Sequence, residues 1–502
     1  MATAETQAGP QASPSPTEPS LTGRVVKGAA WVFAGKLAGR GMSLVRLVVL
    51  ARLLSPEDFG LFGIVMLAIA TLETFTQTGF NTALIQRRDN TEDYLDTAWT
   101  VQIIRGFVLA GLLYASAPLV GWFFDEPRAI PLLRVMCISV AVGGFVNIGT
   151  IYFRKELRFH KQVIWDTASS FVGLVVGIVL AYQLRSVWAL VWAGLAAAPV
   201  RVLLSYAIHP YHPRARFDAS QANELFRFGK WMLGSSVVVL LATRLDHMML
   251  GKVLGAGALG IYTIAYTISN MPATEITHLA NAVMMPAYAK IGDDRRRLGN
   301  VFLQVFELVM SLAIPLTAFI ILAAPQIVLG LLGSQWEAAV LPLRILALAG
   351  LLRSVNATSG PLFVGSGRPH MAFWINLSRA AVIAVATYPL TRLFGVPGAG
   401  VAVVLALGST LPIWATVRQI GAVSWGAILR AMAQGFVLAG LVAVAVLSVR
   451  LLLPRVGPLC TLVMQGTAAA MVCGATVLLT GRWLNRGVSL YALKAWRSIR
   501  TA

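Results

Sequence analysis

Apolar stretches of about 20 residues recur between roughly residues 28 and 481, and short polar segments connect them. A helix of about 20 apolar residues is long enough to cross the hydrocarbon core of a bilayer. A membrane barrel would instead show strands of about 10 residues with strict alternation, which this pattern does not resemble. The pattern predicts an all-α polytopic membrane protein. We expect about fourteen transmembrane helices, at residues 28–51, 59–80, 97–122, 130–152, 163–184, 187–208, 229–251, 258–286, 299–323, 338–362, 371–392, 397–417, 427–449 and 458–480.

Residues 31–65 recur 200 positions further along the chain. Each copy has a charged apolar helix, a short turn and a second apolar helix, which indicates two related halves. The offset covers six predicted helices, an even number that preserves direction, so we expect parallel repeats about an axis along the membrane normal. Five of the 35 aligned positions are identical: Trp31 with Trp231, Leu50 with Leu250, Leu54 with Leu254, Gly60 with Gly260, and Ile64 with Ile264.

The repeat divides the chain into parts. Residues 1–20 are rich in Pro, Ser and Thr and lack the apolar core of a signal peptide, so they predict a disordered tail. At the other end, apolar residues recur every third position among basic ones, which is typical of an amphipathic helix on the membrane surface. The predicted parts are a disordered cytoplasmic tail (1–22), an N-terminal six-helix bundle (23–208), a cytoplasmic linker (209–228), a C-terminal six-helix bundle (229–420), two additional helices (421–481) and an amphipathic cytoplasmic tail (482–502).

Composition supports the membrane assignment and argues against an enzyme. Hydrophobic residues make up 57% of the chain and charged residues only 12%, with a mean hydropathy of +0.72, whereas soluble domains carry about 25% charged residues. The three cysteines are too widely spaced for a disulfide framework or a metal site. No phosphate-binding loop and no metal-spaced histidine pair occurs. We therefore expect no catalytic residues, no cofactor and no metal.

The net charge of +20 follows the predicted topology. Of the 41 Lys and Arg residues, 24 fall in one set of connections and at the termini, and seven fall in the opposite set. By the positive-inside rule the first set is cytoplasmic, together with both termini. The basic charge then reflects topology and contact with anionic lipid head groups. Nucleic acid is not an expected partner.

The remaining ten basic residues lie inside predicted helices, where a charge costs roughly 2.5–3.5 kcal/mol or more at the bilayer centre. Such side chains should face the bundle interior or a wet cavity. Those near helix ends can snorkel to the interface instead, and Arg134, Arg201 and Arg344 are the leading cases. The ten are Lys36, Arg40, Arg46, Arg105, Arg134, Arg201, Arg244, Arg344, Arg353 and Arg379, and the clearest acids beside them are Glu73, Asp246, Glu275 and Glu307.

The first helix carries the most informative charges. Lys36 and Arg40 are four residues apart and share one helix face. They predict either a cavity for an anionic group or structural ion pairs with Glu73 or other acids of the bundle. The repeat places Arg46 and Asp246 at equivalent positions with opposite charge. An ion pair between them would act as a latch between the halves, unless Asp246 pairs with Arg244 or with a neighbouring helix.

Three stretches resemble a known family. Residues 51–62 read Ala-Arg-Leu-Leu-Ser-Pro-Glu-Asp-Phe-Gly-Leu-Phe, and residues 94–99 read Tyr-Leu-Asp-Thr-Ala-Trp. The third stretch contains Leu245, Asp246, Gly251, Leu254, Gly255, Leu259, Gly260, Ile261, Tyr262, Ala265, Tyr266 and Pro272. Together they are similar to the Wzx-like O-antigen and exopolysaccharide flippases of the MOP exporter superfamily, in the branch that handles colanic-acid or xanthan-type repeat units. The likeness covers roughly residues 22–480.

The resemblance implies a V-shaped, MATE-like pair of six-helix bundles with two further helices. It also implies a cationic cavity that moves an undecaprenyl-diphosphate-linked oligosaccharide across the bacterial inner membrane for exopolysaccharide or lipopolysaccharide synthesis. Expected partners are that lipid-linked oligosaccharide, membrane lipids, a polysaccharide polymerase and a chain-length regulator.

We therefore predict a lipid-linked oligosaccharide flippase that works by alternating access. The predicted substrate-binding residues are Lys36, Arg40, Arg46, Arg244, Arg353 and Arg379, and the predicted ion-coupling or gating residues are Asp246, Glu275 and Glu73. The alternatives are a multidrug antiporter or a peptidoglycan-precursor flippase of the same superfamily, and a membrane-embedded glycosyl- or acyltransferase. A drug exporter should have a cavity dominated by acids, which the excess of intramembrane cations disfavours.

Overall fold

The computed structural model describes residues 21–76, 84, 92–156, 159–291, 294–366, 368, 370–421, 423–452 and 457–479, and these form helices without any strand. Residues 1–20 of the predicted disordered tail 1–22 lie outside the described residues, as does the predicted tail 482–502, whereas Leu21 and Thr22 begin the first helix. The α-helices are α1 (Leu21–Leu53), α2 (Pro56–Phe75), α4 (Leu95–Phe124), α5 (Ala129–Gly143), α6 (Tyr152–Lys155), α7 (Phe159–Leu184), α8 (Trp188–Ile208), α9 (Ala219–Ile291), α10 (Arg295–Ile327), α11 (Val340–Ala357), α12 (Ser359–Gly365), α13 (His370–Phe394), α14 (Val396–Gly408), α15 (Trp414–Gly421), α16 (Trp425–Leu452) and α17 (Pro458–Leu479).

Short helical turns complete the described chain. They are η1 (Glu92–Tyr94), η2 (Ile148–Ile151), the single π-turn η3 (Val328–Leu332), η4 (Ser334–Ala339) and η5 (Leu411–Ile413). The all-helical class predicted from the apolar pattern is confirmed. Helix α14 ends at Gly408, and the turn η5, which contains Pro412, separates it from α15.

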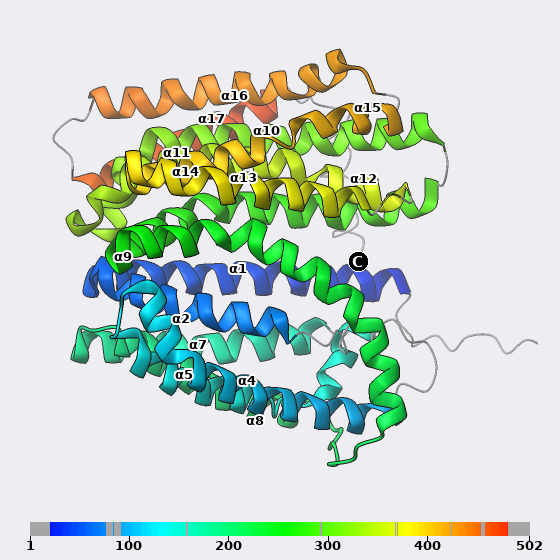
Figure 1. Cartoon of the computed structure of the whole chain (residues 1–502). Helices are drawn as coiled ribbons and strands as arrows, with labels where there is room; N and C mark the ends of the chain where they lie inside the picture. Colours follow the sequence, from blue (N-terminus) through cyan, green and yellow to red (C-terminus); the bar gives the residue numbers. More distant parts are fainter. Residues whose placement is uncertain are drawn as a thin grey trace, which may run out of the picture.

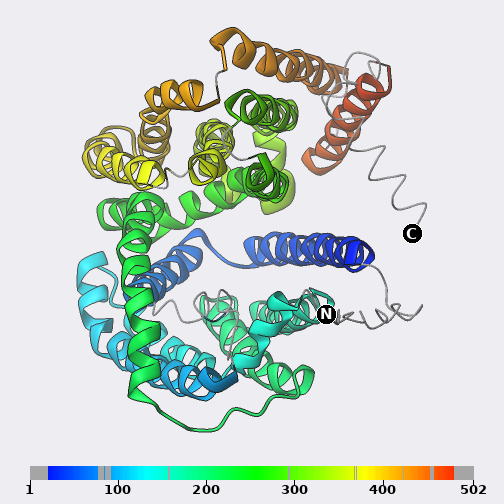
Figure 2. The same ribbon diagram turned by 90° about the vertical axis from the view of Figure 1, so that its right-hand side faces the viewer.

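The long helices lie roughly parallel in one bundle (Figure 1). We call residues 21–208 the first half and residues 219–479 the second half. Viewed from the side, the helices of the two halves form two groups, and α9 extends along both (Figure 2). Accordingly α9 packs against α2 and α4 of the first half and against α10, α11 and α13 of the second. This helix is the main structural link between the halves.

The 73 residues of α9 are two helices joined at one glycine. Gly255 has φ 80° and ψ −176°, and it is the only residue of α9 with non-helical angles. A positive φ of this kind is accessible to glycine and costly for a residue with a Cβ. The chain reverses direction there, at the gap between the spans predicted at 229–251 and 258–286.

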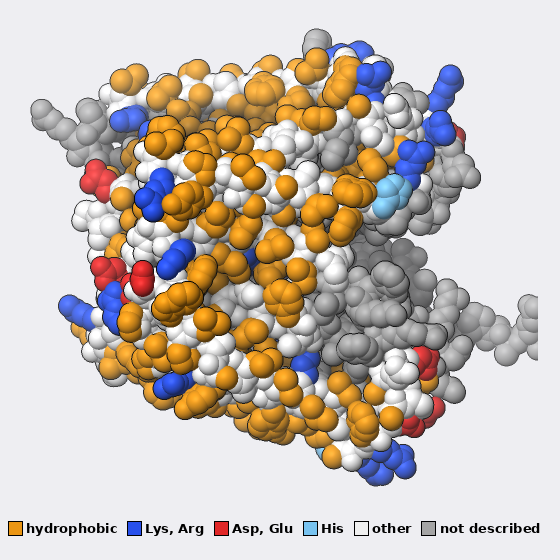
Figure 3. Space-filling view, viewed as in Figure 1, with side chains coloured by type: hydrophobic (Ala, Val, Ile, Leu, Met, Phe, Trp, Pro, Cys, Tyr) orange, Lys and Arg blue, Asp and Glu red, His pale blue; other side chains and the backbone are white. Residues whose placement is uncertain are grey.

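Ten of the described helical segments are long and apolar enough to cross a membrane, and α5 and α14 are shorter apolar helices. The protein is therefore a multi-pass membrane protein. The total of fourteen spans stays a prediction. Hydrophobic side chains cover most of the face shown in Figure 3, and charged side chains gather mainly toward its two ends.

The predicted fourth span, 130–152, extends beyond the helix that forms there. Helix α5 ends at Gly143, and the next residue, Gly144, packs against α4. A Cβ added to Gly144 would lie 3.2 Å from the carbonyl oxygen of Gln102 and 3.3 Å from the Cα of Ile103. The chain continues as the turn η2 and the short helix α6 instead.

The turn between α1 and α2 explains the sequence around residues 51–62. The Ser55 hydroxyl accepts from the backbone N–H of Asp58, and the Asp58 carboxylate accepts from the backbone N–H of Ser55, which forms a capping box. The other carboxylate oxygen of Asp58 accepts from the backbone N–H of Val187, 2.9 Å away, at the start of α8. This turn therefore fixes the entry of α2 and ties it to α8.

The linker between the halves is fastened to the start of α4. The Asp96 carboxylate accepts from the hydroxyl of Tyr211 and from the backbone N–H of Arg214. The Thr97 hydroxyl donates to the side chain of Gln221, 2.7 Å away. Asp218 caps the first turn of α9, and the hydrogen bond from the Ser220 hydroxyl holds the pKa of its carboxyl below the ordinary value. The Tyr94–Trp99 stretch thus docks the linker onto the first half.

Candidate functional site

The halves meet most closely at the end of the bundle where α1 turns into α2. A Cβ added to Gly60 would lie 1.7 Å from the carbonyl oxygen of Ala256, and one added to Gly260 would lie 1.9 Å from that of Pro56. These two contacts exchange places under the 200-residue offset, as a pseudo-two-fold axis between the halves would require. We call this reciprocal contact the glycine crossing.

Further contacts reinforce the same end. The Arg52 guanidinium donates to the carbonyl oxygens of Gly330 and Leu331, at the end of α10 and its π-turn. The Trp336 indole donates to the carbonyl oxygen of Ala51, 2.7 Å away, and packs edge-on against a ring of α2. The two halves are closed against each other here.

An ion pair joins α1 to the second half away from the glycine crossing. Nε of Arg40 lies 2.6 Å from Oε1 of Glu275, and its Nη2 donates to the Thr274 hydroxyl 3.2 Å away. Both side chains are about two-fifths exposed. Two explanations were given for the Lys36–Arg40 pair, a cavity for an anionic group and structural ion pairs. In this structure Arg40 forms a structural ion pair, and its partner is Glu275 rather than Glu73.

Lys36 and Arg244 are exposed on their helices. Within the described part of the chain, neither has a hydrogen bond or an ion pair. Arg46 lies deeper, on the last third of α1, and also has no acceptor within bonding distance among the described residues.

Arg46 lines a cavity of about 370 Å³ inside the first half, formed by α1, α5, α7 and α8. A larger cavity of about 550 Å³ adjoins it, formed by α2, α4, α5, α7 and α8. We call them the smaller and the larger cavity. They share Ser139, Gly143, Val146 and Arg201 in their linings.

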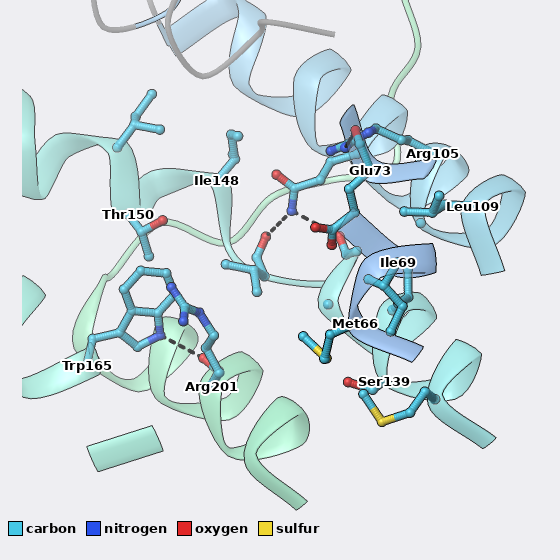
Figure 4. A pocket seen from close by; sticks show the side chains of 18 of the residues that line it. Met66, Ile69, Glu73, Arg105, Leu109, Ser139, Ile148, Thr150, Trp165 and Arg201 are labelled. Carbon is cyan, nitrogen blue, oxygen red and sulfur yellow. Dashed lines mark hydrogen bonds between the residues drawn. The ribbon is translucent and has the colours of Figure 1, made fainter. Parts of the chain in front are cut away.

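Glu73 and Arg105 lie on one side of the larger cavity, and Trp165 and Arg201 lie on the opposite side (Figure 4). Arg105 donates to the Glu73 carbonyl oxygen 3.1 Å away and acts electrostatically on the Glu73 carboxylate. The Arg201 guanidinium lies over the Trp165 ring at 4.3 Å and pairs with Asp166 at 3.2 Å. Arg201 is thus part of a cavity wall, although its position near a helix end had indicated snorkelling.

A buried polar cluster lies in the second half. The Asp246 side chain is about 3% exposed and accepts from the Tyr262 hydroxyl 2.6 Å away. Its other oxygen lies 3.0 Å from Nδ1 of His247. Asp246 therefore bonds to neither Arg46 nor Arg244 in this structure. Its partners come from its own helix and from the helix after Gly255.

Arg353 and Arg379 extend this cluster. The Arg353 guanidinium donates to the side chain of Asn270 and lies 5.0 Å from the Tyr266 ring centre. Arg379 donates to the Ala242 carbonyl oxygen and to the Asn376 side chain, both at 3.4 Å, while its Nε has no partner among the described residues. Arg353 and Asp246 both act electrostatically on Arg379.

The predicted residues thus fall into three places. Arg40 and Glu275 join the halves, Arg46 and Glu73 line the cavities of the first half, and the rest of the bonded set is in the second half: Asp246, Arg353 and Arg379. Arg105 and Arg201 were left out of the predicted site. Both are among the ten basic residues inside predicted helices, and this was the feature of the sequence that could have identified them as site residues.

Apolar helices, polar cavities within them and charges paired across two halves define a multi-pass membrane transporter. The solved structure of the lipid II flippase MurJ in an inward closed conformation superposes with a TM-score of 0.73 over 92% of this chain and 100% of that chain, at 13% identity. An inward-facing multidrug resistance MATE family transporter of the MOP superfamily superposes with a TM-score of 0.59 over 80% of this chain and 94% of that chain, at 17% identity. These likenesses show the fold.

The model of the family described as polysaccharide biosynthesis protein matches residues 49–341, and the chain belongs to this family. It is 26% identical over 360 residues to the lipopolysaccharide biosynthesis protein WzxC of Escherichia coli (strain K12), covering 71% of this chain and 73% of the relative. It is 27% identical over 361 residues to the teichuronic acid biosynthesis protein TuaB of Bacillus subtilis (strain 168), covering 71% and 74%. The resemblance seen in the sequence is confirmed.

Proposed function

We propose that this protein is a flippase that moves undecaprenyl-diphosphate-linked oligosaccharide repeat units across the bacterial inner membrane by alternating access. The units would supply exopolysaccharide or lipopolysaccharide synthesis. The family match supports this role, and a relative with 27% identity is named as a succinoglycan transport protein. Among the described residues, the single structural observation that carries the proposal is Arg46, a cation without a bonded acid in an intramembrane cavity. Such a group favours an anionic ligand.

The diphosphate would interact with cations from both halves. Lys36 and Arg46 on α1 would meet it first, and Arg244 would approach from α9. Arg40 would join them when the diphosphate displaces Glu275, since phosphate and carboxylate compete for the same guanidinium. Arg353 and Arg379 would line the second half. The polyprenyl chain would remain in lipid and pass through a lateral opening between the halves.

Both termini and the 209–228 linker would be cytoplasmic, which places the glycine crossing on the periplasmic side. The structure would then correspond to a state closed toward the periplasm. Asp246, Glu275 and Glu73 are candidates for coupling an ion to the return of the empty carrier. A polymerase and a chain-length regulator would receive the exported unit.

The alternatives are less well supported. The cavities of the first half contain three arginines and one glutamate in their linings, the opposite of the acid-dominated cavity expected for a cationic-drug antiporter. The likeness to the lipid II flippase is one of fold at 13% identity. The family match and the likeness of fold to solved transporters favour a transporter over a membrane-embedded transferase.

Deletion of the gene tests the proposal. Cells without the protein should stop displaying their surface polysaccharide and accumulate the lipid-linked repeat unit on the inner membrane, and the intact gene should reverse both effects. An Arg46→Gln protein that reaches the membrane normally should restore export poorly. Unchanged polysaccharide in the deletion strain, together with increased sensitivity to cationic dyes, would favour the drug antiporter.

A further inference from the structure

The two cavities of the first half differ in how their charges are balanced. In the smaller cavity, Arg46 has no bonded acid among the described residues. In the larger cavity, Arg105 acts on Glu73, and Arg201 is paired with Asp166. Resting on the proposed function, we propose that the larger cavity is a saccharide subsite that takes a hexose ring of the repeat unit, while the diphosphate lies beside Arg46 in the smaller cavity.

Charge balance is the first reason. A diphosphate entering the larger cavity would meet the Glu73 carboxylate, which acts electrostatically on Arg105, and would have to compete with Asp166 for Arg201, which lines both cavities. An unpaired charge is costly in such surroundings. A hexose hydroxyl instead donates to a carboxylate and accepts from a guanidinium without disturbing their balance. Paired ions therefore suit a neutral polyhydroxylated ring better than a phosphate.

The composition of the lining is the second reason. Besides Glu73 and Arg105, the cavity is lined by Gln102, Thr150 and Trp165. The Trp165 indole N–H and the Gln102 amide nitrogen already donate to backbone carbonyl oxygens, so the arginines supply the donors. The Glu73 carboxylate and the side-chain oxygens of Gln102 and Thr150 supply the acceptors that a sugar ring also needs. The cavity volume of about 550 Å³ lies within the range of small-molecule sites, about 300–1,000 Å³.

The polar groups of the cavity are held in place before any ligand enters. The Gln102 amide nitrogen donates to the carbonyl oxygens of Gly144 and Val146, at 3.1 and 2.9 Å. Nε of Arg105 donates to the Thr76 hydroxyl at 3.3 Å. Side chains fixed in this way lose little freedom when a ligand binds. The cavity is preorganised for a polar ligand.

The relation between the two cavities is the third reason. They share a wall that includes Ser139 and Arg201. The first sugar of a lipid-linked unit is bonded directly to the diphosphate, so a sugar site and a phosphate site must be neighbours. A phosphate beside Arg46 places the attached ring toward the larger cavity.

Two lipid probes test the assignment. Full-length protein in nanodiscs is offered undecaprenyl diphosphate and undecaprenyl diphosphate bearing one glucose, and both are quantified by native mass spectrometry. The wild type should bind the glucosyl lipid at least about tenfold more tightly than the bare lipid, a preference of about 1.4 kcal/mol. Glu73→Gln, which removes a carboxylate, and Thr150→Phe, which fills the larger cavity at a residue that does not line the smaller one, should lose that preference and keep the affinity for the bare lipid.

The controls separate this proposal from the function on which it rests. Arg46→Gln should weaken both lipids by the same factor, and Glu307→Gln, another acid within a helix but outside the cavities, should resemble the wild type. If the wild type binds neither lipid, the flippase proposal fails and the subsite with it. If it binds both without preference, or if Glu73→Gln and Thr150→Phe both retain the preference, the subsite alone is overturned.

Discussion

A methyl group at Gly60 should open the glycine crossing. The added Cβ would lie 1.7 Å from the carbonyl oxygen of Ala256 and 2.4 Å from its carbonyl carbon, both of them backbone atoms. Side-chain rearrangement cannot relieve such overlaps, so α2 and α9 must move apart. Overpacking of this kind typically costs about 1–3 kcal/mol.

The overlap raises the free energy of the state in which the two halves touch at the glycine crossing. A state in which the halves are separated there has no overlap, so its free energy is unchanged. A bias of 1–3 kcal/mol shifts a two-state equilibrium by about 5- to 150-fold. Gly60→Ala should therefore enrich the state in which the crossing is open. Spin labels on the exposed residues Glu57 and Glu337 would report this as a longer distance in double electron–electron resonance measurements in nanodiscs.

Two further variants make the measurement decisive. Gly260→Ala should act like Gly60→Ala, because its Cβ would lie 1.9 Å from the Pro56 carbonyl oxygen. Gly63→Ala is the matched control, since its nearest neighbour would lie 3.6 Å away, at ordinary contact distance. Identical distance distributions for Gly60→Ala, Gly63→Ala and the wild type would refute the reasoning, even if Gly60→Ala lowered the thermal stability.

Three other expectations concern the ion pair, the topology and the α2 cap. Arg40→Glu and Glu275→Arg should each lower the free energy of unfolding by up to about 1 kcal/mol, as for a partly exposed ion pair, and the double swap should restore part of the loss; thermal unfolding measures this apart from export, and no recovery would count against the pair. A single cysteine replacing Ala215 should resist labelling from the periplasm and one replacing Pro127 should react, and the reverse result would invert the proposed orientation. Asp58→Ala should lower the free energy of unfolding by about 1–2 kcal/mol through loss of the capping box, measured by thermal unfolding, whereas alanine at the exposed glutamate before it should change little; equal losses would argue against the cap.

Much of the fold follows from local patterns. Apolar length predicts the helices, and the glycine-containing turn between residues 251 and 258 predicts the break that the structure places at Gly255. The end of α5 was missed because the apolar pattern continues beyond Gly143. The close approach of Gly144 to α4, a tertiary contact between residues about 40 positions apart, could not be read from that pattern either. The pattern of apolar and polar residues does not predict which glycine packs against the backbone of which helix.

The candidate site was only partly accessible from the sequence. Intramembrane position singled out both Arg40 and Glu275, but their pairing across 235 residues could not be read from spacing. The repeat offset equated the depth of Arg46 and Asp246 without fixing the direction of their side chains, and Asp246 turns toward Tyr262 instead. Arg201 appeared peripheral by position along its helix, whereas the cavity it lines is created by the five helices packed around it.

The fastening of the linker to α4 also bears on how the chain is made. Every described bond that holds the linker involves residues up to Glu224, such as Tyr94 to Glu224 and Thr97 to Gln221. These groups are all synthesised before the membrane-spanning part of the second half, which begins at Gly234. Domains generally fold in the order of synthesis. The first half can therefore bind the linker first, and the helices synthesised later can then pack against it.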